Sequence, residues 1–313
     1  MPTRPILELR ASVRSRLRGL FDAVGFLEVD TPVLSSEVLP EAHIDPIAVH
    51  LDGHGTPPHF LQASPEALMK RLLAAGSGPI YQFARSFRAG ERGARHDVEF
   101  VLLEWYAPGT TLDDTAPFLA RLCEAALGTS GIERTTCREA FLTHAGVDPL
   151  SASLAAWRAA GARAGVRLPE HHADTPDDWF EAILSEMVAP QLGRGRPTML
   201  EDWPASQAAF ARIVGGAPPV ARRFELFVEG VELANGWEEE TGRESLLERI
   251  ADANRIRAAN GRGALPVPER LVAAHGAQMP AGVGAALGFD RLVMLAGGAD
   301  TIDRVRAFSS RTA

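Results

Sequence analysis

The sequence predicts an α+β fold in which helices flank an antiparallel sheet, and three observations favour this class. Two runs of strand-forming residues, 80–88 and 99–106, are joined by a polar loop, which is typical of neighbouring antiparallel strands. A second group of strands is expected at 222–240. Strands and helices do not alternate regularly along the chain, so a parallel sheet built from βαβ units is disfavoured.

The segment before these strands predicts two helices and one further strand. Residues 5–24 carry apolar side chains at helical spacing. Residues 26–34 have the composition of a strand, and Pro32 confines it to a sheet edge or to a strand end because proline has no N–H to donate. A short helix at about 65–75 begins after Ser64, a residue type that caps helix N-termini.

The rest of the chain predicts an insertion followed by further elements. Residues 112–200 have a helical periodicity that Gly and Pro interrupt, and we interpret them as a helical insertion within a single domain spanning 1–313. A helix is expected at about 243–260, and a glycine-rich strand passes into a helix at 282–298.

Composition excludes several classes of protein. The chain has 313 residues, 46% of them hydrophobic, and no apolar run reaches the ~18 residues of a membrane helix. Cys123 and Cys137 have no CxxC partner, so we expect buried free thiols in a reducing, cytoplasmic setting. The net charge is −8, and the basic residues are spread among acidic ones. Binding to an extended nucleic acid is therefore disfavoured, and Lys70, the single lysine, is interpreted as a surface or interface charge.

One carboxylate falls on a strand that otherwise consists of core residues. Side chains alternate between the two faces of a strand, so Glu104 and Tyr106 point to the same side. A buried carboxylate costs free energy unless a cation pairs with it. Two interpretations remain open, namely a pocket for the ammonium group of a ligand and an internal ion pair with Arg85 or Arg88.

Two carboxylates of the later strands are candidates for a metal site. We expect Glu229 and Gly230 to form a two-residue turn. Phe227 then lies opposite Glu232, and Glu225 sits diagonally across on the same face, ~7–8 Å away. Oxygen ligands at this separation suit Mg²⁺ that keeps waters and also touches phosphates. The alternative is that both are ordinary exposed strand carboxylates.

A glycine-rich passage, Gly282–Leu295, allows backbone to approach a ligand and then starts a helix that carries Arg291. Its glycine spacing differs from the GxGxxG dinucleotide fingerprint, and no Gly-Lys-Ser/Thr follows, so it is not a phosphate-binding P-loop either. By itself this passage does not identify a ligand.

Taken together and in this order, the segments resemble the three signature motifs of class II aminoacyl-tRNA synthetases. The matching segments are 5–32 for motif 1, 87–106 for motif 2 and 284–295 for motif 3. Within that class the chain is similar to the lysyl branch, and in particular to the shortened lysyl paralogues that attach (R)-β-lysine to elongation factor P. The likeness is carried by Ser64–Glu66, Leu103–Tyr106, Pro204–Gln207, Glu232–Gly236 and the stretch 222–295. It covers nearly the whole chain and is weakest at 112–200.

The resemblance implies a set of site residues. Arg88 and Arg291 would be the catalytic residues that hold the ATP phosphates, as planar donors suited to phosphate oxygens. The nucleotide would contact Arg88, Glu91, His96, Asp97, Phe100, Glu232 and Arg291. The amino acid would contact Glu66, Glu104, Tyr106, Asn235, Glu239 and Ala286. Mg²⁺ would bind to Glu225 and Glu232.

The resemblance also implies the reaction and its partners. A ligase of this kind activates (R)-β-lysine, or lysine, with ATP as an adenylate and transfers it to a lysine side chain of elongation factor P. Motif 1 begins near residue 5, which leaves no room for an anticodon-binding domain ahead of it, so tRNA is disfavoured as acceptor. Homodimerisation is expected through motif 1. The alternatives are transfer to tRNA or another carrier, and a non-catalytic paralogue that binds an amino acid or nucleotide.

The chain departs from the family pattern at several positions. Gly90 stands where motif 2 has Glu, and the family's Asn-Pro is Asp97-Val98 here. Two added carboxylates, Glu238 and Glu240, are interpreted as solvent-exposed. Ala286 stands where the tRNA-ligating lysyl enzymes have Gly. A methyl group in a tight pocket discriminates between substrates by ~1–3 kcal/mol, which would favour a β-amino isomer over lysine.

Overall fold

The computed structural model describes residues 3–51, 57–169 and 174–313. The chain divides into two compact units, the first comprising Met1–Thr110, Ala125–Leu127 and Glu240–Ala313, and the second comprising Thr111–Glu124 and Gly128–Glu239. The prediction of a single catalytic domain with an insertion stays a prediction. Within the described ranges, no helix combines the length and the apolar character that a membrane span requires.

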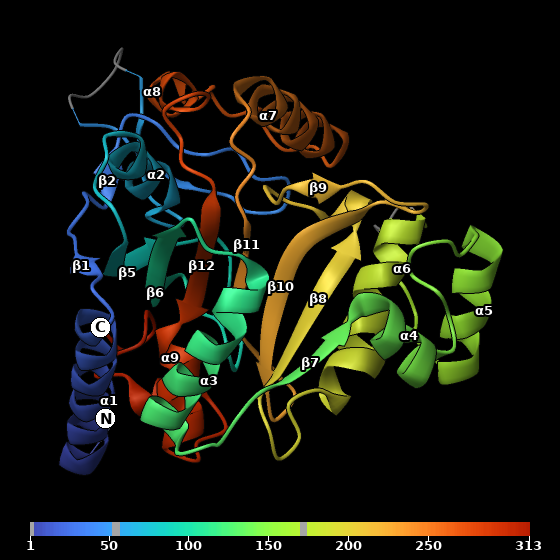
Figure 1. Cartoon of the computed structure of the whole chain (residues 1–313), viewed down its shortest axis with the longest axis horizontal. Coiled ribbons are helices and arrows are strands. Elements are labelled where there is room, and N and C mark those ends of the chain that lie inside the picture. Colours follow the sequence, from blue (N-terminus) through green and yellow to red (C-terminus); the bar gives the residue numbers. More distant parts are fainter. Residues whose placement is uncertain (1–2, 52–56, 170–173) are drawn as a thin grey trace. The chain divides into compact units, whose positions relative to one another are not determined.

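The first unit contains a long N-terminal helix, several short strands, a long hairpin and a final strand followed by a helix (Figure 1). Its elements are α1 (Arg4–Ala23), β1 (Leu27–Glu28), β2 (Leu34–Ser35), β3 (Ile47–Val49), β4 (His59–Leu61), α2 (Glu66–Ala74), β5 (Ile80–Phe87), β6 (Glu99–Pro108), α7 (Arg243–Ala259), α8 (Glu269–Ala274), β12 (Gly282–Gly288), α9 (Phe289–Ala296) and the 3-10 helix η4 (Ile302–Val305).

Strands β1, β5, β6 and β12 are neighbours in that order, and β2, β4 and β3 form a small separate sheet. β6 pairs antiparallel with both β5 and β12, whereas β1 pairs parallel with β5. The predicted α+β class with an antiparallel sheet is confirmed. The predicted strand 26–34 is wrong in extent, because only Leu27–Glu28 pairs with β5, and β2 starts after Pro32.

Helices α1 and α9 pack on one face of this sheet. The ring of Phe21, a fully buried residue of α1, stacks on Tyr81 of β5 with the ring centroids 4.5 Å apart. Phe289 at the start of α9 contacts Phe83 edge-on at 5.2 Å. Because alternate residues of a strand face opposite sides, these aromatic rings leave the other face of β5 and β6 to the polar residues, Glu104 among them.

The second unit contains most of α3 and the elements that follow it (Figure 1). These are α3 (Leu112–Leu127), β7 (Glu133–Thr136), α4 (Cys137–Ala145), α5 (Leu154–Ala164), α6 (Pro176–Ile183), the π-helix η1 (Leu184–Val188), the 3-10 helices η2 (Ala189–Gln191) and η3 (Ala205–Gln207), β8 (Thr198–Pro204), β9 (Ile213–Val214), β10 (Val220–Val228) and β11 (Val231–Glu238).

Strands β11, β10, β8 and β7 are neighbours in that order, and β9 lies beside β10. Helices α4 and α6 share an aromatic core with β8, in which Phe141 stacks on Phe180 at 4.7 Å and Phe180 contacts Trp203 at 5.6 Å. The predicted insertion is therefore largely helical, but the prediction missed β7 and the start of β8. The four residues of β7 are polar, so the sequence has no apolar alternation to mark this strand.

The hairpin of β10 and β11 turns at Glu229 and Gly230, as the sequence predicts. Their φ angles are 51° and 72°, the left-handed values that a type I′ turn requires at both positions. Phe227 pairs with Glu232, so the expected register is confirmed at this point.

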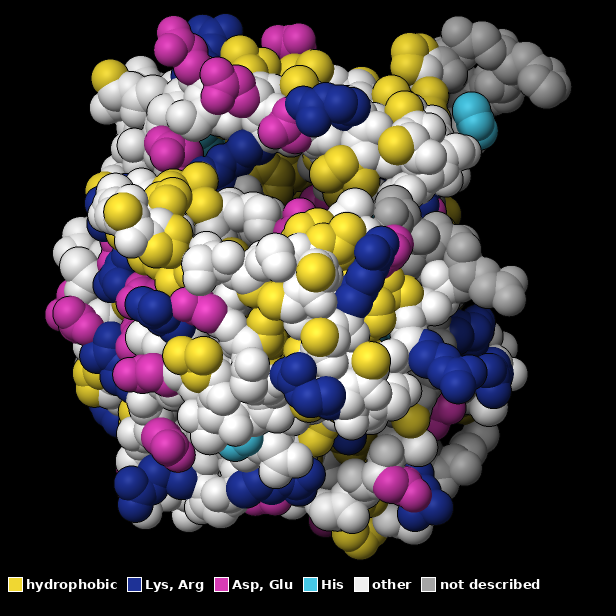
Figure 2. All heavy atoms as spheres, turned by 90° about the vertical axis from the view of Figure 1, so that its right-hand side faces the viewer, with side chains coloured by type: hydrophobic (Ala, Val, Ile, Leu, Met, Phe, Trp, Pro, Cys, Tyr) yellow, Lys and Arg dark blue, Asp and Glu magenta, His cyan; other side chains and the backbone are white. Residues whose placement is uncertain are grey.

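Charged side chains of both signs are mixed on the face shown in Figure 2, and basic groups do not form a continuous stripe there.

Candidate active site

The polar face of β6 lies beside a strand with almost no side chains. Tyr106 and Glu104 of β6 pair with Gly284 and Ala286 of β12. Because β12 carries only glycine and alanine at the positions of this face, the largest group beside the Glu104 carboxylate on that side is a methyl group. No large side chain of β12 therefore covers the Glu104 carboxylate from this side, as a ligand pocket requires.

Glu104 is held by two hydroxyl groups and not by an arginine. Its carboxylate accepts hydrogen bonds from Ser64 Oγ and Tyr106 Oη, both at 2.7 Å, and its residue is 2% exposed. Burial, followed by the charge of Glu66, raises the pKa of Glu104 to about 8. Of the two interpretations left open, internal pairing with Arg85 is wrong, because Arg85 pairs with Glu99.

Glu66 opens α2 beside Glu104. Its backbone N–H donates to Ser64 Oγ at 3.0 Å, so one serine joins the two acidic residues. The helix begins one residue later than predicted, and the Glu66 carboxylate pairs with Lys70 one turn on, at 2.7 Å. Lys70 is 2% exposed, so its interpretation as a surface or interface charge is wrong.

Glu41 is a member of this acidic group that the sequence did not reveal. Burial raises the pKa of Glu41 to about 7, the charge of Arg88 lowers it, and the charges of Glu66 and Glu91 raise it. Glu41 lies in an irregular loop that carries no periodic pattern, and buried Arg257 anchors this loop by donating to the Glu41 carbonyl at 3.1 Å. No signal in the sequence alone marks this residue.

Arg88 follows β5 and has the properties of an anion-binding residue. Its guanidinium lies over the Phe100 ring at 5.0 Å and 3.7 Å from the Glu91 carboxylate. Among the described residues, its buried Nε has no hydrogen-bond partner. A buried donor without an acceptor is costly, so the arginine fits a site that receives a phosphate or carboxylate oxygen.

Arg291 of α9 reaches the loop between β5 and β6. Its Nη2 donates to His96 Nε2 at 2.6 Å, since a guanidinium has no acceptor, and its Nε donates to the Arg95 carbonyl at 3.2 Å. The structure thus brings Arg291 and His96 together, as predicted. Asp97 next to them is 3% exposed, and all its described contacts are with protein groups.

The second unit holds the two candidate metal ligands. Glu225 is buried opposite Asn235, and a register shift in β10 and β11 separates this pair from that of Phe227 with Glu232. Burial, followed by the charge of Glu232, raises the pKa of Glu225 to about 8. Such mutual repulsion is relieved by a cation, so the donor set fits Mg²⁺. Within the described ranges, no three His, Cys, Asp or Glu residues form a complete protein-only metal site.

Arg223 provides one cation near these carboxylates. It donates to Glu225 Oε1 at 2.6 Å and to Asn235 Oδ1 at 3.1 Å, and its guanidinium lies 3.9 Å from the centre of the Trp203 ring. Glu239, another predicted substrate residue, is 5% exposed and accepts a hydrogen bond from Trp237 Nε1 at 3.1 Å.

The interpretation of Glu238 as solvent-exposed is wrong. Its residue is 6% exposed, and it pairs with Arg212 and Arg222 and accepts the Leu112 N–H. Glu240 is partly buried and accepts the N–H of Gly242.

The predicted site residues thus form two groups. The first unit contains Glu66, Arg88, Glu91, His96, Asp97, Phe100, Glu104, Tyr106, Ala286 and Arg291. The second contains Glu225, Glu232, Asn235 and Glu239. That all of them line one cavity stays a prediction.

Comparison with known proteins agrees with the motifs. The sequence matches the family described as tRNA synthetases class II (D, K and N) over residues 2–312. It is 40% identical to the elongation factor P–(R)-β-lysine ligase of Edwardsiella ictaluri, over 98% of this chain and 96% of that protein. The ligases of the same name from Yersinia pestis and Yersinia pseudotuberculosis are 38% identical over the same shares.

Proposed function

This chain belongs to the class II tRNA synthetase family of the D, K and N type, and on that basis we propose that it ligates (R)-β-lysine to elongation factor P at the expense of ATP. The observation that carries the proposal is the buried carboxylate of Glu104. It is held by hydroxyl groups and faces only Gly and Ala positions of β12, so a ligand ammonium can take the place of the proton that burial favours.

The first half of the reaction forms an adenylate. A carboxylate oxygen of the amino acid attacks the α-phosphorus of ATP, the bond to the bridging oxygen breaks, and pyrophosphate leaves. No covalent bond to the enzyme is needed, so the task of the protein is alignment and neutralisation of charge. Arg88 offers an unpaired buried donor to the phosphate oxygens, and Arg291 provides a second guanidinium.

The acidic group of the first unit selects the amino acid. Ser64 donates to the Glu104 carboxylate and accepts the backbone N–H of Glu66, and Tyr106 fixes the orientation of Glu104. Lys70 already neutralises part of the charge of Glu66, which leaves Glu104 as the principal partner for a ligand ammonium. A diamino acid is thus preferred over an amino acid with an apolar side chain.

Glu225 and Glu232 would hold Mg²⁺, which supplies a charge clamp for the triphosphate when it is bound. Arg223 keeps the Glu225 carboxylate in place beside Asn235.

The second half of the reaction transfers the aminoacyl group. The ε-amine nitrogen of a lysine on elongation factor P attacks the carbonyl carbon of the adenylate, AMP leaves with the bonding electron pair, and the nitrogen loses a proton. The product is an amide, so the mass of the factor increases by one β-lysyl residue.

Intact-mass measurement tests this function. Purified enzyme is incubated with ATP, Mg²⁺, elongation factor P and either (R)-β-lysine or lysine. We expect one mass increase that depends on ATP and is larger in yield with (R)-β-lysine. A parallel reaction with deacylated tRNA serves as control. An unmodified factor together with charged tRNA would refute the proposed acceptor.

A further inference from the structure

Asp97 lies in the loop that carries His96, yet its carboxylate is bound to a distant segment of the chain. Oδ2 accepts hydrogen bonds from Arg306 Nη1 at 2.8 Å and from the Ser310 N–H at 2.9 Å. Oδ1 accepts from the Ser310 hydroxyl, from the Val98 N–H and, at 3.3 Å, from Arg92 Nη1 of the same loop. Arg306 is 9% exposed, so both charges of this pair are largely shielded from water.

The same loop is fastened at two further points. The Ala94 carbonyl accepts the N–H of Ile302 at 2.9 Å, and Arg291 contacts the Arg95 carbonyl and the His96 ring. Four consecutive residues, 94–97, are therefore tied to α9 and to the segment that follows it. We call residues 302–310 the strap.

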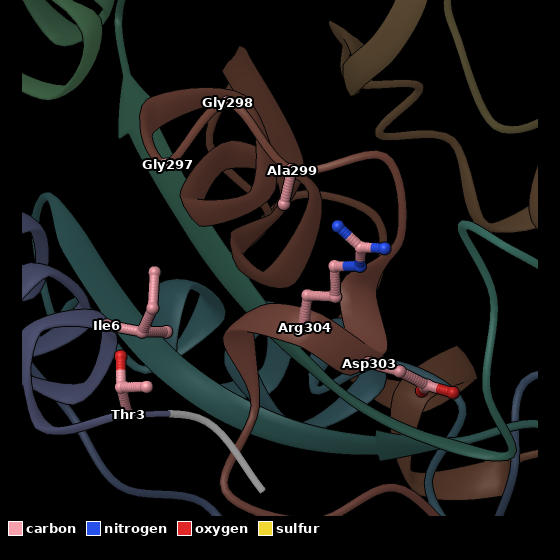
Figure 3. A pocket seen from close by; sticks show the side chains of 7 residues that line it. All are labelled: Thr3, Ile6, Gly297, Gly298, Ala299, Asp303 and Arg304. Carbon is pink, nitrogen blue, oxygen red and sulfur yellow. The ribbon is translucent and has the colours of Figure 1, made fainter.

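The strap also contacts elements other than the loop 89–98, which we call the nucleotide loop. Its first part, η4, contacts α9 and α1. A hollow of about 420 Å³ lies there, lined by the first residues of α1, by Gly297–Ala299 and by Asp303 and Arg304 (Figure 3). Arg304 forms an exposed ion pair with Asp300 and contacts no described residue of the nucleotide loop, which makes it a natural control for Arg306.

In the contact between Asp97 and Arg306, the residue types on the two sides complement each other in charge and hydrogen bonding. The two residues on the loop side of this contact are Asp97 and Val98. The aspartate supplies the charge that a buried Arg306 needs, and the valine supplies a backbone N–H to Asp97 that a proline lacks. Without Asp97 the buried Arg306 loses its carboxylate, whereas without Arg306 the Asp97 carboxylate keeps, among the described residues, only the part-exposed Arg92 as a charged partner.

We propose that Asp97 and Arg306 are positioning residues for ATP, because the strap holds the loop 89–98 so that His96 and Arg291 meet the triphosphate. Neither residue touches the reacting atoms. This inference rests on the proposed function for the choice of (R)-β-lysine as the amino acid in the kinetic test. The effect that it predicts is on the affinity for ATP.

Variants of the pair test the proposal. For R306Q and D97N we expect the dissociation constant of a non-hydrolysable ATP analogue, and the KM for ATP in pyrophosphate exchange, to rise about tenfold. The KM for (R)-β-lysine should stay within about twofold, because the hydrogen bonds described for the Glu104 carboxylate come from Ser64 and Tyr106. R306K keeps the charge and should restore most of the affinity, and R304Q should behave as the unaltered enzyme.

The double variant D97N/R306Q measures the coupling. If the two residues act through one contact, its loss of ATP affinity should be close to that of either single variant, whereas independent residues would give about a hundredfold loss. Hydrogen–deuterium exchange of the peptides covering 89–98 should be faster in R306Q than in R304Q without nucleotide.

Two results would overturn the proposal. One is unchanged binding of the ATP analogue and unchanged loop exchange in R306Q and D97N. The other is an equal rise in the KM for both substrates, which would indicate a general structural defect, and thermal unfolding identifies this case. A failure of the unaltered enzyme to exchange pyrophosphate with any lysine isomer would contradict the proposed function alone, because analogue binding and loop exchange still report on the strap.

Discussion

The Glu104 carboxylate accepts hydrogen bonds from two hydroxyl groups and, among the described residues, pairs with no guanidinium. This environment sets the pH range in which Glu104 takes up a proton. A carboxylate in an apolar site takes up a proton more readily, and a neighbouring carboxylate strengthens the effect. Its pKa of about 8 and that of Glu41 near 7 mean that both groups bind protons at neutral pH when no ligand is present. A ligand ammonium favours the ionised form, so binding must release protons.

The affinity for the diamino acid should therefore rise as the pH increases from about 6 to about 8.5. Below pH 7 the free pocket is protonated and binding has to remove protons, whereas above pH 8 Glu104 is already ionised and the ligand amine is still charged. Calorimetry in two buffers of different ionisation enthalpy measures the protons released. Binding that is independent of pH across this range would contradict the assignment, and E104Q should abolish most of the release.

The pair of Lys70 with Glu66 predicts an effect on stability. Their side chains are 3% and 10% exposed, so K70M leaves the Glu66 carboxylate buried without its partner. We expect the free energy of unfolding to fall by about 3 kcal/mol in urea titrations. The double variant E66Q/K70M should recover part of this loss because it buries no charge. A surface role for Lys70 would instead give a change of only a few tenths of a kcal/mol.

At the scale of elements, alternation and turn chemistry made the site strands predictable. The faces of β5 and β6 and the turn at Glu229 and Gly230 follow from rules that act over a few residues. Strand β7 could not be predicted in this way, because its polar residues form a strand only through pairing with β8, more than sixty residues later. Likewise, the burial of Lys70 depends on neighbours that its helical spacing does not reveal.

The binding of Asp97 by Arg306 is a further feature that sequence could not supply. The two residues are 209 positions apart, and no local pattern links them. The family motif pointed to the nucleotide, and the structure adds hydrogen bonds from Arg306 and Ser310 to this carboxylate. A local sequence motif therefore does not predict contacts, such as this one, between single charged residues that are far apart in the chain.

The bare face of β12 predicts a change in substrate preference. Ala286 pairs with Glu104, so its methyl group stands beside the carboxylate that receives the ligand. A286G should shift the ratio of kcat/KM for (R)-β-lysine over lysine toward lysine by about tenfold, as expected for one methyl group. A285G is the matched control because Ala285 pairs with Trp105 on the opposite face. An unchanged ratio in A286G would show that this methyl group does not discriminate.

At the scale of the whole molecule, we predict a homodimer formed through motif 1. Leu27, which follows α1 within motif 1, is a large apolar side chain that is 59% exposed. Light scattering should give twice the 33.6 kDa of one chain. L27E should shift the equilibrium toward monomer, whereas I213E, which alters an exposed residue of the second unit, should not. A monomer at micromolar concentration would contradict this prediction.

The account as a whole depends on the claim that a buried acidic pocket recognises the second amine of the substrate. ATP–pyrophosphate exchange measured with (R)-β-lysine, lysine and norleucine tests it most directly, because norleucine has a side chain like that of lysine without the terminal amine. We predict exchange with both diamino acids and at least about a hundredfold lower kcat/KM with norleucine. Exchange with norleucine at a rate similar to that with lysine would contradict the claim.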